Sequence, residues 1–186
     1  MNNTVEQVAD LLIECFKSGN KLLLCGNGGS AADCAHIAGE LCKGFLLKRK
    51  LDEELLNNIG EDWARNLQQG LPAIDLTANT ALITAIVNDI GAYDIFAQQL
   101  LSYGKSGDVL ICISTSGNAE NVIRAAKVAK ALNIKVIGLT GASGGKLKEL
   151  CDLLLNVDET ETYLVQEKHI KLYHRFCILV EEAIFG

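Results

Sequence analysis

An apolar run that ends in a glycine-rich turn and continues as a helical pattern is the feature that most restricts the fold of this chain. The run covers residues 22–25, the turn reads Gly26-Asn27-Gly28-Gly29, and small residues then begin the helical pattern at Ser30. Glycines allow positive φ and let a ligand approach the backbone amides closely. A helix that begins here would point unpaired N–H groups and its positive end into the turn. Strand, glycine turn and helix N-terminus together are typical of a phosphate site.

Two other interpretations of this turn remain open. Residues 26–31 match the dinucleotide pattern G-x-G-x-x-A, but that fold requires an acidic residue about 20 positions further on. Residues 42–46 contain no acidic residue and no convincing strand pattern. A Walker P-loop is excluded because no Gly-Lys-Ser/Thr follows the turn. The sequence therefore favours a phosphate-ester site, with a purely structural turn and a dinucleotide site as alternatives.

Hydrophobic periodicity predicts a single α/β domain over residues 1–186. Strands are expected at 21–25, 71–76, 108–113, 135–139 and 151–157, and helices at 4–17, 30–44, 79–87, 93–101, 119–132 and 161–185, with a further helix after the loop at 140–145. Strands that alternate with helices predict a parallel sheet flanked by helices on both faces.

A charged segment at about 46–70 interrupts this alternation as a helical insertion. Apolar residues recur at every fourth position: Leu51, Leu55, Ile59, Trp63 and Leu67. This spacing predicts one helix, or two short helices broken near Gly60. Such an insertion would cover an edge or a site, or form an interface.

A weak internal repeat points to a shared ligand crevice. Ser18-Gly19-Asn20 precedes the first strand, and Ser106-Gly107-Asp108 precedes the strand at 108–113 in the same way. Each of these strands leads into a loop of small residues. In a parallel sheet both loops lie at the carboxyl edge, where ligands bind. Two such loops strengthen the prediction of a phosphate site.

Composition excludes several classes of function. The formal charge is −6 and no basic run occurs, which argues against a nucleic-acid partner. No apolar run reaches the length that spans a bilayer, and residues 1–7 lack the pattern of a secretory signal, so we expect a cytoplasmic protein that does not enter membranes. Seven cysteines without a C-x-x-C pair predict reduced, mostly buried thiols.

The loop after the strand at 108–113 is rich in hydroxyl groups. It reads Ser114-Thr115-Ser116-Gly117-Asn118 and precedes a predicted helix. Neutral hydroxyls and successive amides suit a phosphate monoester that must be released again. One helix N-cap also prefers these residue types, but it needs a single side chain. Ligand binding is therefore the favoured interpretation.

Histidines and a glutamate on two predicted helices are candidates for chemistry. His36 and Glu40 share one helix face at i, i+4, and Gln166, His169 and His174 lie on the last helix. A Glu and a His that reach one cavity would form an acid/base pair, and imidazoles with carboxylate and amide oxygens suit a divalent metal. Taken alone, each could equally be a structural histidine or a surface pair.

The motifs in combination resemble the phosphoheptose isomerases of the sugar isomerase (SIS) domain superfamily. The resemblance rests on residues 25–33, Asn88-Asp89, residues 114–118, residues 139–141 and the Gln166-Glu167-x-His169-Ile170-x-x-x-His174 pattern. It implies a SIS-type, flavodoxin-like three-layer sandwich and a cytoplasmic homotetramer. It also implies a role in making the heptose of surface glycoconjugates.

The resemblance assigns roles to individual positions. Substrate contacts would come from Asn27, Gly28, Gly29, Ser30, Asn88, Asp89, Ser114, Thr115, Ser116 and Gln166. Glu40 and His174 would be the catalytic pair. His36, Glu40, Gln166 and His174 match the positions that hold a zinc ion in some members.

The expected reaction converts sedoheptulose 7-phosphate to D-glycero-D-manno-heptose 7-phosphate through an enediol. Two alternatives remain: a non-catalytic SIS-domain protein that binds a partner, and an isomerase of another phosphosugar. Because the non-catalytic branch loses the acid/base pair, the presence of both Glu40 and His174 favours an enzyme.

Overall fold

The computed structural model describes residues 2–186, which form a five-stranded parallel sheet. The strands are β1 (Leu22–Gly26), β2 (Ala73–Asp75), β3 (Val109–Ser114), β4 (Lys135–Thr140) and β5 (Leu153–Asn156). Their order is β2-β1-β3-β4-β5, and every neighbouring pair is parallel. This is the flavodoxin-like order, so the predicted fold class is confirmed.

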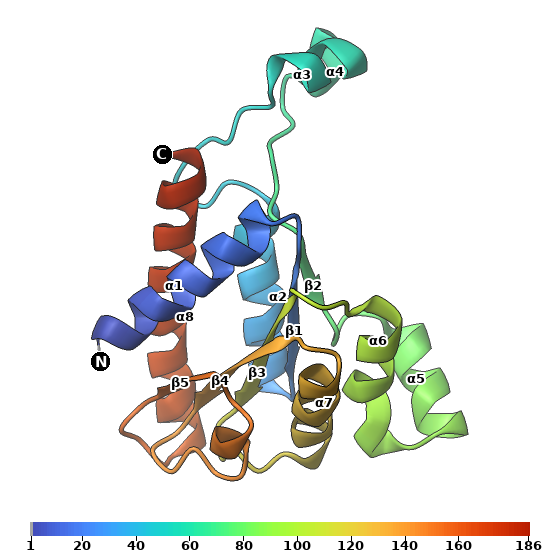
Figure 1. The fold of residues 1–186 in the computed structure, drawn as a ribbon, viewed down its shortest axis with the longest axis vertical. Helices are drawn as coiled ribbons and strands as arrows, with labels where there is room; N and C mark the ends of the chain where they lie inside the picture. Colours follow the sequence, from blue (N-terminus) through green and yellow to red (C-terminus); the bar gives the residue numbers. More distant parts are fainter. Residues whose placement is uncertain (1) are drawn as a thin grey trace.

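Three helices cover one face of the sheet: α1 (Asn2–Lys17), α2 (Gly29–Cys42) and the long α8 (Thr162–Phe185) (Figure 1). Alternate strand side chains point to this face, and Leu22, Leu24 and Ile111 pack there against Phe176 of α8. Because both faces of a parallel sheet are buried, the strands read as continuous apolar runs. Burial of this core places α2 and α8 side by side.

The opposite face is covered by α6 (Ile95–Tyr103) and α7 (Glu120–Ala131), with α5 (Thr80–Asp89) and the short 3₁₀ turn η1 (Ala92–Asp94) packed beside them (Figure 1). Leu23, Cys25 and Leu110 form the core here with Phe96 of α6. The helix expected after the loop at 140–145 is wrong: a single 3₁₀ turn, η2 (Leu147–Glu149), occupies that position. Gly144 and Gly145 both adopt positive φ and leave too short a connection for a helix before β5.

The register of the two central strands matches the internal repeat in the sequence. Leu22 pairs with Val109, and Cys25 pairs with Cys112. The two similar segments therefore lie side by side, and the loops that follow them leave the sheet at the same edge. The predicted convergence of these loops is confirmed.

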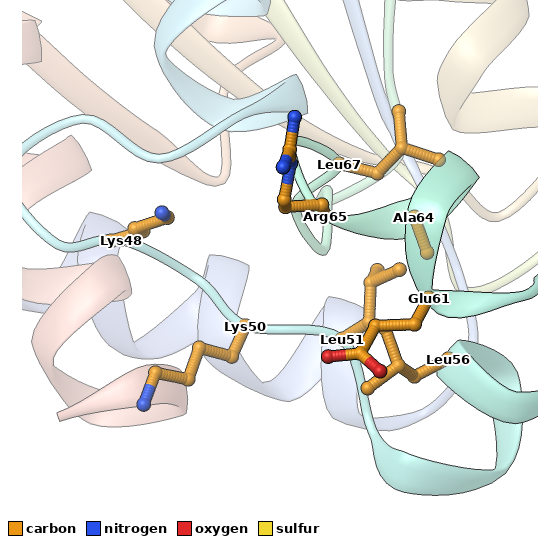
Figure 2. Close-up of a pocket in the computed structure, with 8 residues that line it drawn as sticks. All are labelled: Lys48, Lys50, Leu51, Leu56, Glu61, Ala64, Arg65 and Leu67. Atoms are coloured by element: carbon orange, nitrogen blue, oxygen red, sulfur yellow. The ribbon is translucent and has the colours of Figure 1, made fainter.

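A helical arm projects from the body between α2 and β2 (Figure 1). It carries α3 (Glu53–Ile59) and α4 (Glu61–Ala64), which are separated at Gly60 as the sequence predicts. Trp63 is 83% exposed, and Leu55 and Leu67 are also exposed. A pocket of about 270 Å³ lies between the arm and the segment that leads to it (Figure 2). None of the predicted site residues lines this pocket.

Among residues 2–186, no helix has both the length and the apolar character needed to cross a membrane.

Candidate functional site

The two small-residue loops meet at the centre of the sheet. β1 and β3 are neighbours, but the chain continues from β1 to β2 on one side and from β3 to β4 on the other. This topological switch point leaves a crevice outside the carboxyl ends of the strands, where ligands bind in open α/β sheets. The glycine turn after β1 and the hydroxyl loop after β3 flank it.

The glycine turn holds the N-terminus of α2 close to the end of β1. Gly28 adopts a φ of 56°, which favours glycine. The N–H of Ser30 donates to the carbonyl of Asn27 at 3.0 Å, and a Cβ at Gly26 would collide with the Ser30 carbonyl. Because of this close approach, Ser30 is buried at the first turn of α2.

Both loops contain backbone N–H groups that have no backbone acceptor. Over the described part of the chain, the N–H groups of Gly28, Thr115 and Ser116 donate to no backbone carbonyl. The Ser116 hydroxyl also accepts from the Asn118 N–H at 3.1 Å, as a local turn requires. Free amides at a helix N-terminus are suited to an anion, so this end of the site fits a phosphate group.

A pair of asparagines joins the two loops. The Asn27 amide donates to Asn121 Oδ1 at 2.9 Å, and the Asn121 amide donates back at 2.8 Å. Asn121 lies in the first turn of α7. Because both side chains are engaged in this pair, Asn27 offers its backbone to a ligand. Asn121 was not predicted from the sequence, where the polar first turn after a hydroxyl loop was the available signal.

The candidate catalytic groups gather on α2 and α8. His36 Nε2 lies 3.2 Å from Glu40 Oε1 and 3.4 Å from His174 Nε2. The Phe45 ring packs against His174, with ring centroids 5.5 Å apart. The Glu40 carboxylate is largely buried, and Lys43 Nζ approaches its other oxygen at 3.4 Å. The structure thus brings His36, Glu40 and His174 into one cluster.

A tyrosine and an aspartate orient His36 within this cluster. The Tyr173 hydroxyl donates to Asp33 Oδ1 at 3.3 Å and lies 2.8 Å from His36 Nδ1. Burial raises the pKa of Tyr173 and, against the opposing effects of Tyr173 and His36, that of Asp33. A phenol that donates to Asp33 can accept from Nδ1–H of His36, which fixes the orientation of the imidazole ring. Neither Asp33 nor Tyr173 was predicted from the sequence.

Gln166 lies at the other end of α2, beside the glycine turn. A Cβ at Gly29 would collide with the Gln166 side-chain amide. His174 follows Gln166 by eight residues, about 12 Å along a helix. The structure therefore places Gln166 beside the glycine turn and apart from His36, Glu40 and His174.

Other predicted residues lie outside these two groups. Asn88 and Asp89 end α5, where the Asn88 amide donates to Asp89 Oδ1 at 2.6 Å. Within residues 2–186, neither side chain makes a hydrogen bond to any predicted site residue outside this pair. His169 is buried in the core with its Nε2 3.2 Å from the Thr140 carbonyl, and burial lowers its pKa. His169 is therefore a structural histidine.

The cluster fits a zinc ion in donor type and in part of its geometry. Ligand atoms about 2.0–2.2 Å from a tetrahedral zinc lie roughly 3.3–3.5 Å apart. The two spacings around His36 Nε2, 3.2 and 3.4 Å, are close to this value. However, no three His, Cys, Asp or Glu side chains of the described residues converge on one point as a bound ion requires. No step of the chemistry is therefore assigned to a metal.

Known proteins share both the sequence and the fold of this chain. The SIS domain model matches residues 1–70 and 67–141. A phosphoheptose isomerase from Aneurinibacillus thermoaerophilus is 46% identical over 181 residues, which cover 97% of this chain and 82% of that protein.

Two solved structures superpose on nearly the whole chain. The phosphoheptose isomerase from Neisseria gonorrhoeae has a TM-score of 0.81 at 38% identity, and the one from Francisella tularensis has 0.83 at 33%. Each comparison covers 97% of this chain and 86% of the other. The matched span includes both loops, α2 and α8.

Proposed function

The chain belongs to the phosphoheptose isomerase family of SIS-domain proteins, and we propose that it interconverts sedoheptulose 7-phosphate and D-glycero-D-manno-heptose 7-phosphate. It is an aldose–ketose isomerase, which decides against the non-catalytic alternative. The observation that carries the proposed mechanism is the cluster of His36, Glu40 and His174 across α2 and α8. A cytoplasmic location follows as a further part of the proposal.

The phosphate group is held by the two loops at the switch point. The backbone N–H groups of Gly28, Thr115 and Ser116, which donate to no backbone carbonyl in residues 2–186, would bind the phosphate oxygens, and the hydroxyls of Ser30, Ser114 and Ser116 would add neutral donors. The positive end of α2 favours the dianion. Gln166 lies against Gly29 and reaches the sugar next to its phosphate. Asn88 and Asp89 complete the proposed contacts from α5.

Isomerisation proceeds by proton transfer between neighbouring carbons. One of Glu40 and His174 removes a proton from C1 of the open-chain ketose while the C2 carbonyl oxygen gains a proton, which gives an enediol. Return of a proton to C2 and loss of the proton on the C1 oxygen give the aldehyde. General acid/base catalysis of this kind contributes roughly 10²–10⁴-fold. The Tyr173–Asp33 pair holds His36, which in turn positions both groups.

Zinc binding at His36, Glu40, Gln166 and His174 is part of the proposal. When bound, the ion would act as a Lewis acid on the carbonyl oxygen. Elemental analysis of protein purified without chelators should find zinc near one per chain, and His36→Gln should lower that content. Full activity in thoroughly chelated, metal-free protein would restrict the cluster to acid/base chemistry.

A homotetramer with sites shared between chains is supported by the same geometry. In one chain Gln166 contacts Gly29, whereas His174 meets His36 seven residues further along α2. A single ion or a compact sugar that engages all four predicted zinc positions would therefore draw them from two chains. The exposed apolar side chains of the arm, Leu55, Trp63 and Leu67, supply surface for such an assembly.

A panel of ketose phosphates with five to seven carbons tests the substrate. The purified protein should convert the seven-carbon 7-phosphate to its aldose with the highest kcat/KM, as followed by NMR and mass spectrometry. Higher kcat/KM for a shorter ketose phosphate would favour the alternative of another phosphosugar.

A further inference from the structure

A buried ion pair joins the end of α2 to the last turns of α8. Arg49 is 2% exposed and Glu181 is 1% exposed, and Arg49 Nε lies 2.8 Å from Glu181 Oε1. Neither residue belongs to the predicted site. Charged side chains are almost never buried this completely unless they are paired, so their contacts define what the pair does.

Glu181 fixes the segment that follows α2. Its carboxylate accepts from the backbone N–H groups of Phe45 at 2.8 Å, Leu46 at 2.7 Å and Leu47 at 3.0 Å. Burial of the carboxyl raises its pKa, but these donors and Arg49 outweigh burial and hold the pKa of Glu181 below its ordinary value. Glu181 therefore stays ionised and anchors three consecutive amides.

Arg49 fixes the end of α2 itself. It donates from Nη1 to the Leu41 carbonyl at 2.5 Å and from Nη2 to the Glu40 carbonyl at 3.1 Å. The last carbonyls of a helix have no partner within the helix, so this guanidinium satisfies two of them. The backbone of Glu40, a predicted catalytic residue, is bonded directly to the ion pair.

We propose that Arg49 and Glu181 are positioning residues that hold Glu40 and His174 at their working separation. Arg49 holds the backbone of Glu40, and Glu181 holds that of Phe45, whose ring packs on His174. Glu181 also follows His174 by seven residues, which places it on nearly the same face of α8, about 10 Å along the axis. The ion pair thus binds the backbone of Glu40 directly and acts on His174 through Phe45.

The chemistry of the pair supports positioning over simple stabilisation. A buried ion pair adds little stability compared with apolar side chains of similar volume. Hydrogen bonds, however, are directional. Arg49 bonds the end of α2, Glu181 bonds residues 45–47, and the two side chains bond each other. This inference rests on the proposed roles of Glu40 and His174.

The chain offers a matched control in a second buried carboxylate, which precedes β3. Asp108 is fully buried and accepts from the N–H groups of Lys21 at 3.0 Å and Lys105 at 2.9 Å, while Lys21 Nζ lies 2.6 Å away. Asp108→Asn removes the same kind of buried carboxylate as Glu181→Gln. The partners of its side chain are Lys21 and Lys105, which make no hydrogen bond to His36, Glu40 or His174, so Asp108→Asn measures the effect of lost stability alone.

The test compares Arg49→Lys, Glu181→Gln and Asp108→Asn with the wild type. Melting temperature, kcat and KM for sedoheptulose 7-phosphate, and the His174 ring signals in NMR of histidine-labelled protein are measured for each. Arg49→Lys keeps a cation beside Glu181 but loses the bonds to the helix end. If Glu181→Gln does not fold, the comparison uses Arg49→Lys and Phe45→Leu in its place, because both variants keep the Glu181 carboxylate.

We expect Arg49→Lys and Glu181→Gln to lower kcat about 10–100-fold through misplacement of Glu40, with KM within roughly threefold. The His174 signals should shift in both, whereas Asp108→Asn should keep kcat and these signals at a similar loss of melting temperature. Unshifted His174 signals, or kcat as high in Arg49→Lys as in Asp108→Asn, would overturn the inference. Glu40→Gln is assayed alongside to separate the catalytic role of Glu40 from the positioning role of Arg49. Wild-type activity in Glu40→Gln would overturn the catalytic role. An inactive Glu40→Gln together with a fully active Arg49→Lys would overturn the positioning role alone.

Discussion

The side-chain amide of Gln166 lies directly against Gly29, with no room between them for a Cβ. Seven residues further along each helix, Tyr173 of α8 meets His36 of α2. A spacing of seven residues returns to nearly the same face of a helix. The two helices are therefore aligned in parallel, with the glycine turn at the first contact and the cluster of His36, Glu40 and His174 at the second.

Gly29→Ala should weaken substrate binding because the new methyl group displaces Gln166 from the glycine turn. We expect a KM increase of several-fold, about 1 kcal/mol for one lost hydrogen bond to the sugar. Gly39→Ala is the control, since a Cβ at Gly39 in the same helix has nothing within 4 Å. That substitution should leave KM unchanged and add about 0.5–1 kcal/mol of stability. Equal KM values for the two variants would contradict the placement of Gln166 in the site.

Ser116→Ala should weaken phosphate binding by a few-fold, because one neutral hydrogen bond contributes about 1 kcal/mol. The matched control is Ser143→Ala: Ser143 Oγ also accepts from a backbone N–H two residues on, that of Gly145 at 3.3 Å, in a loop outside the predicted site. Calorimetric titration with a substrate-like sugar phosphate measures both. Unchanged affinity in Ser116→Ala would refute the assignment of the hydroxyl loop to the phosphate.

Stability should depend on the ionisation of Glu181. Burial opposes ionisation, but the N–H groups of residues 45–47 and Arg49 outweigh it and hold the pKa below the ordinary 4.5. A lowered folded-state pKa means that the stabilisation is complete above the unfolded pKa and is lost as the pH falls through the folded one. At neutral pH the wild type should exceed Glu181→Gln by about 3–5 kcal/mol in free energy of unfolding.

Denaturant titrations of the two proteins at a series of pH values check this. The difference in free energy of unfolding between wild type and Glu181→Gln should be constant from about pH 6 to 8. It should shrink below about pH 4.5, where protonation of Glu181 makes the wild type resemble the variant. A difference that stays the same down to pH 3 would show that Glu181 is not held ionised by these donors.

Mixed oligomers should regain activity if one site draws on two chains. Glu40 lies ten residues after Ser30, about 15 Å along α2, which exceeds the reach of the substrate from its own phosphate loop. Glu40→Gln and the double variant Ser114→Ala, Ser116→Ala, each with lowered activity alone at substrate concentrations below KM, are dissociated and reassembled together. Some mixed sites then hold two intact halves. Confirmed hetero-oligomers that remain inactive would place the whole site within one chain.

The fold could be predicted because its signals are local. Residues 22–25 and 109–113 are continuous apolar runs, as expected for strands buried on both faces, and each ends at a loop of small residues. The helix expected after residue 145 is replaced by a 3₁₀ turn because Gly144 and Gly145 at positive φ leave too short a connection before β5, which periodicity does not register.

The site could be predicted only in part. The i, i+4 spacing of His36 and Glu40 reveals their shared face, and hydroxyl density reveals the phosphate loop. Three hydrogen-bonded pairs are far apart in the sequence: 140 residues separate Tyr173 from Asp33, 94 separate Asn27 from Asn121, and 132 separate Arg49 from Glu181. Such contacts depend on how helices dock, so no local pattern indicates them.

The most direct test of the account follows sedoheptulose 7-phosphate by NMR in D₂O with the wild type, Glu40→Gln and the control Glu167→Gln, an exposed carboxylate beside Gln166. The account predicts an aldoheptose 7-phosphate that carries solvent deuterium at C2 for the wild type and Glu167→Gln, and a rate lower by roughly 10²–10⁴-fold for Glu40→Gln. Absence of the aldose with the wild type, or a rate for Glu40→Gln equal to that of Glu167→Gln, would contradict it.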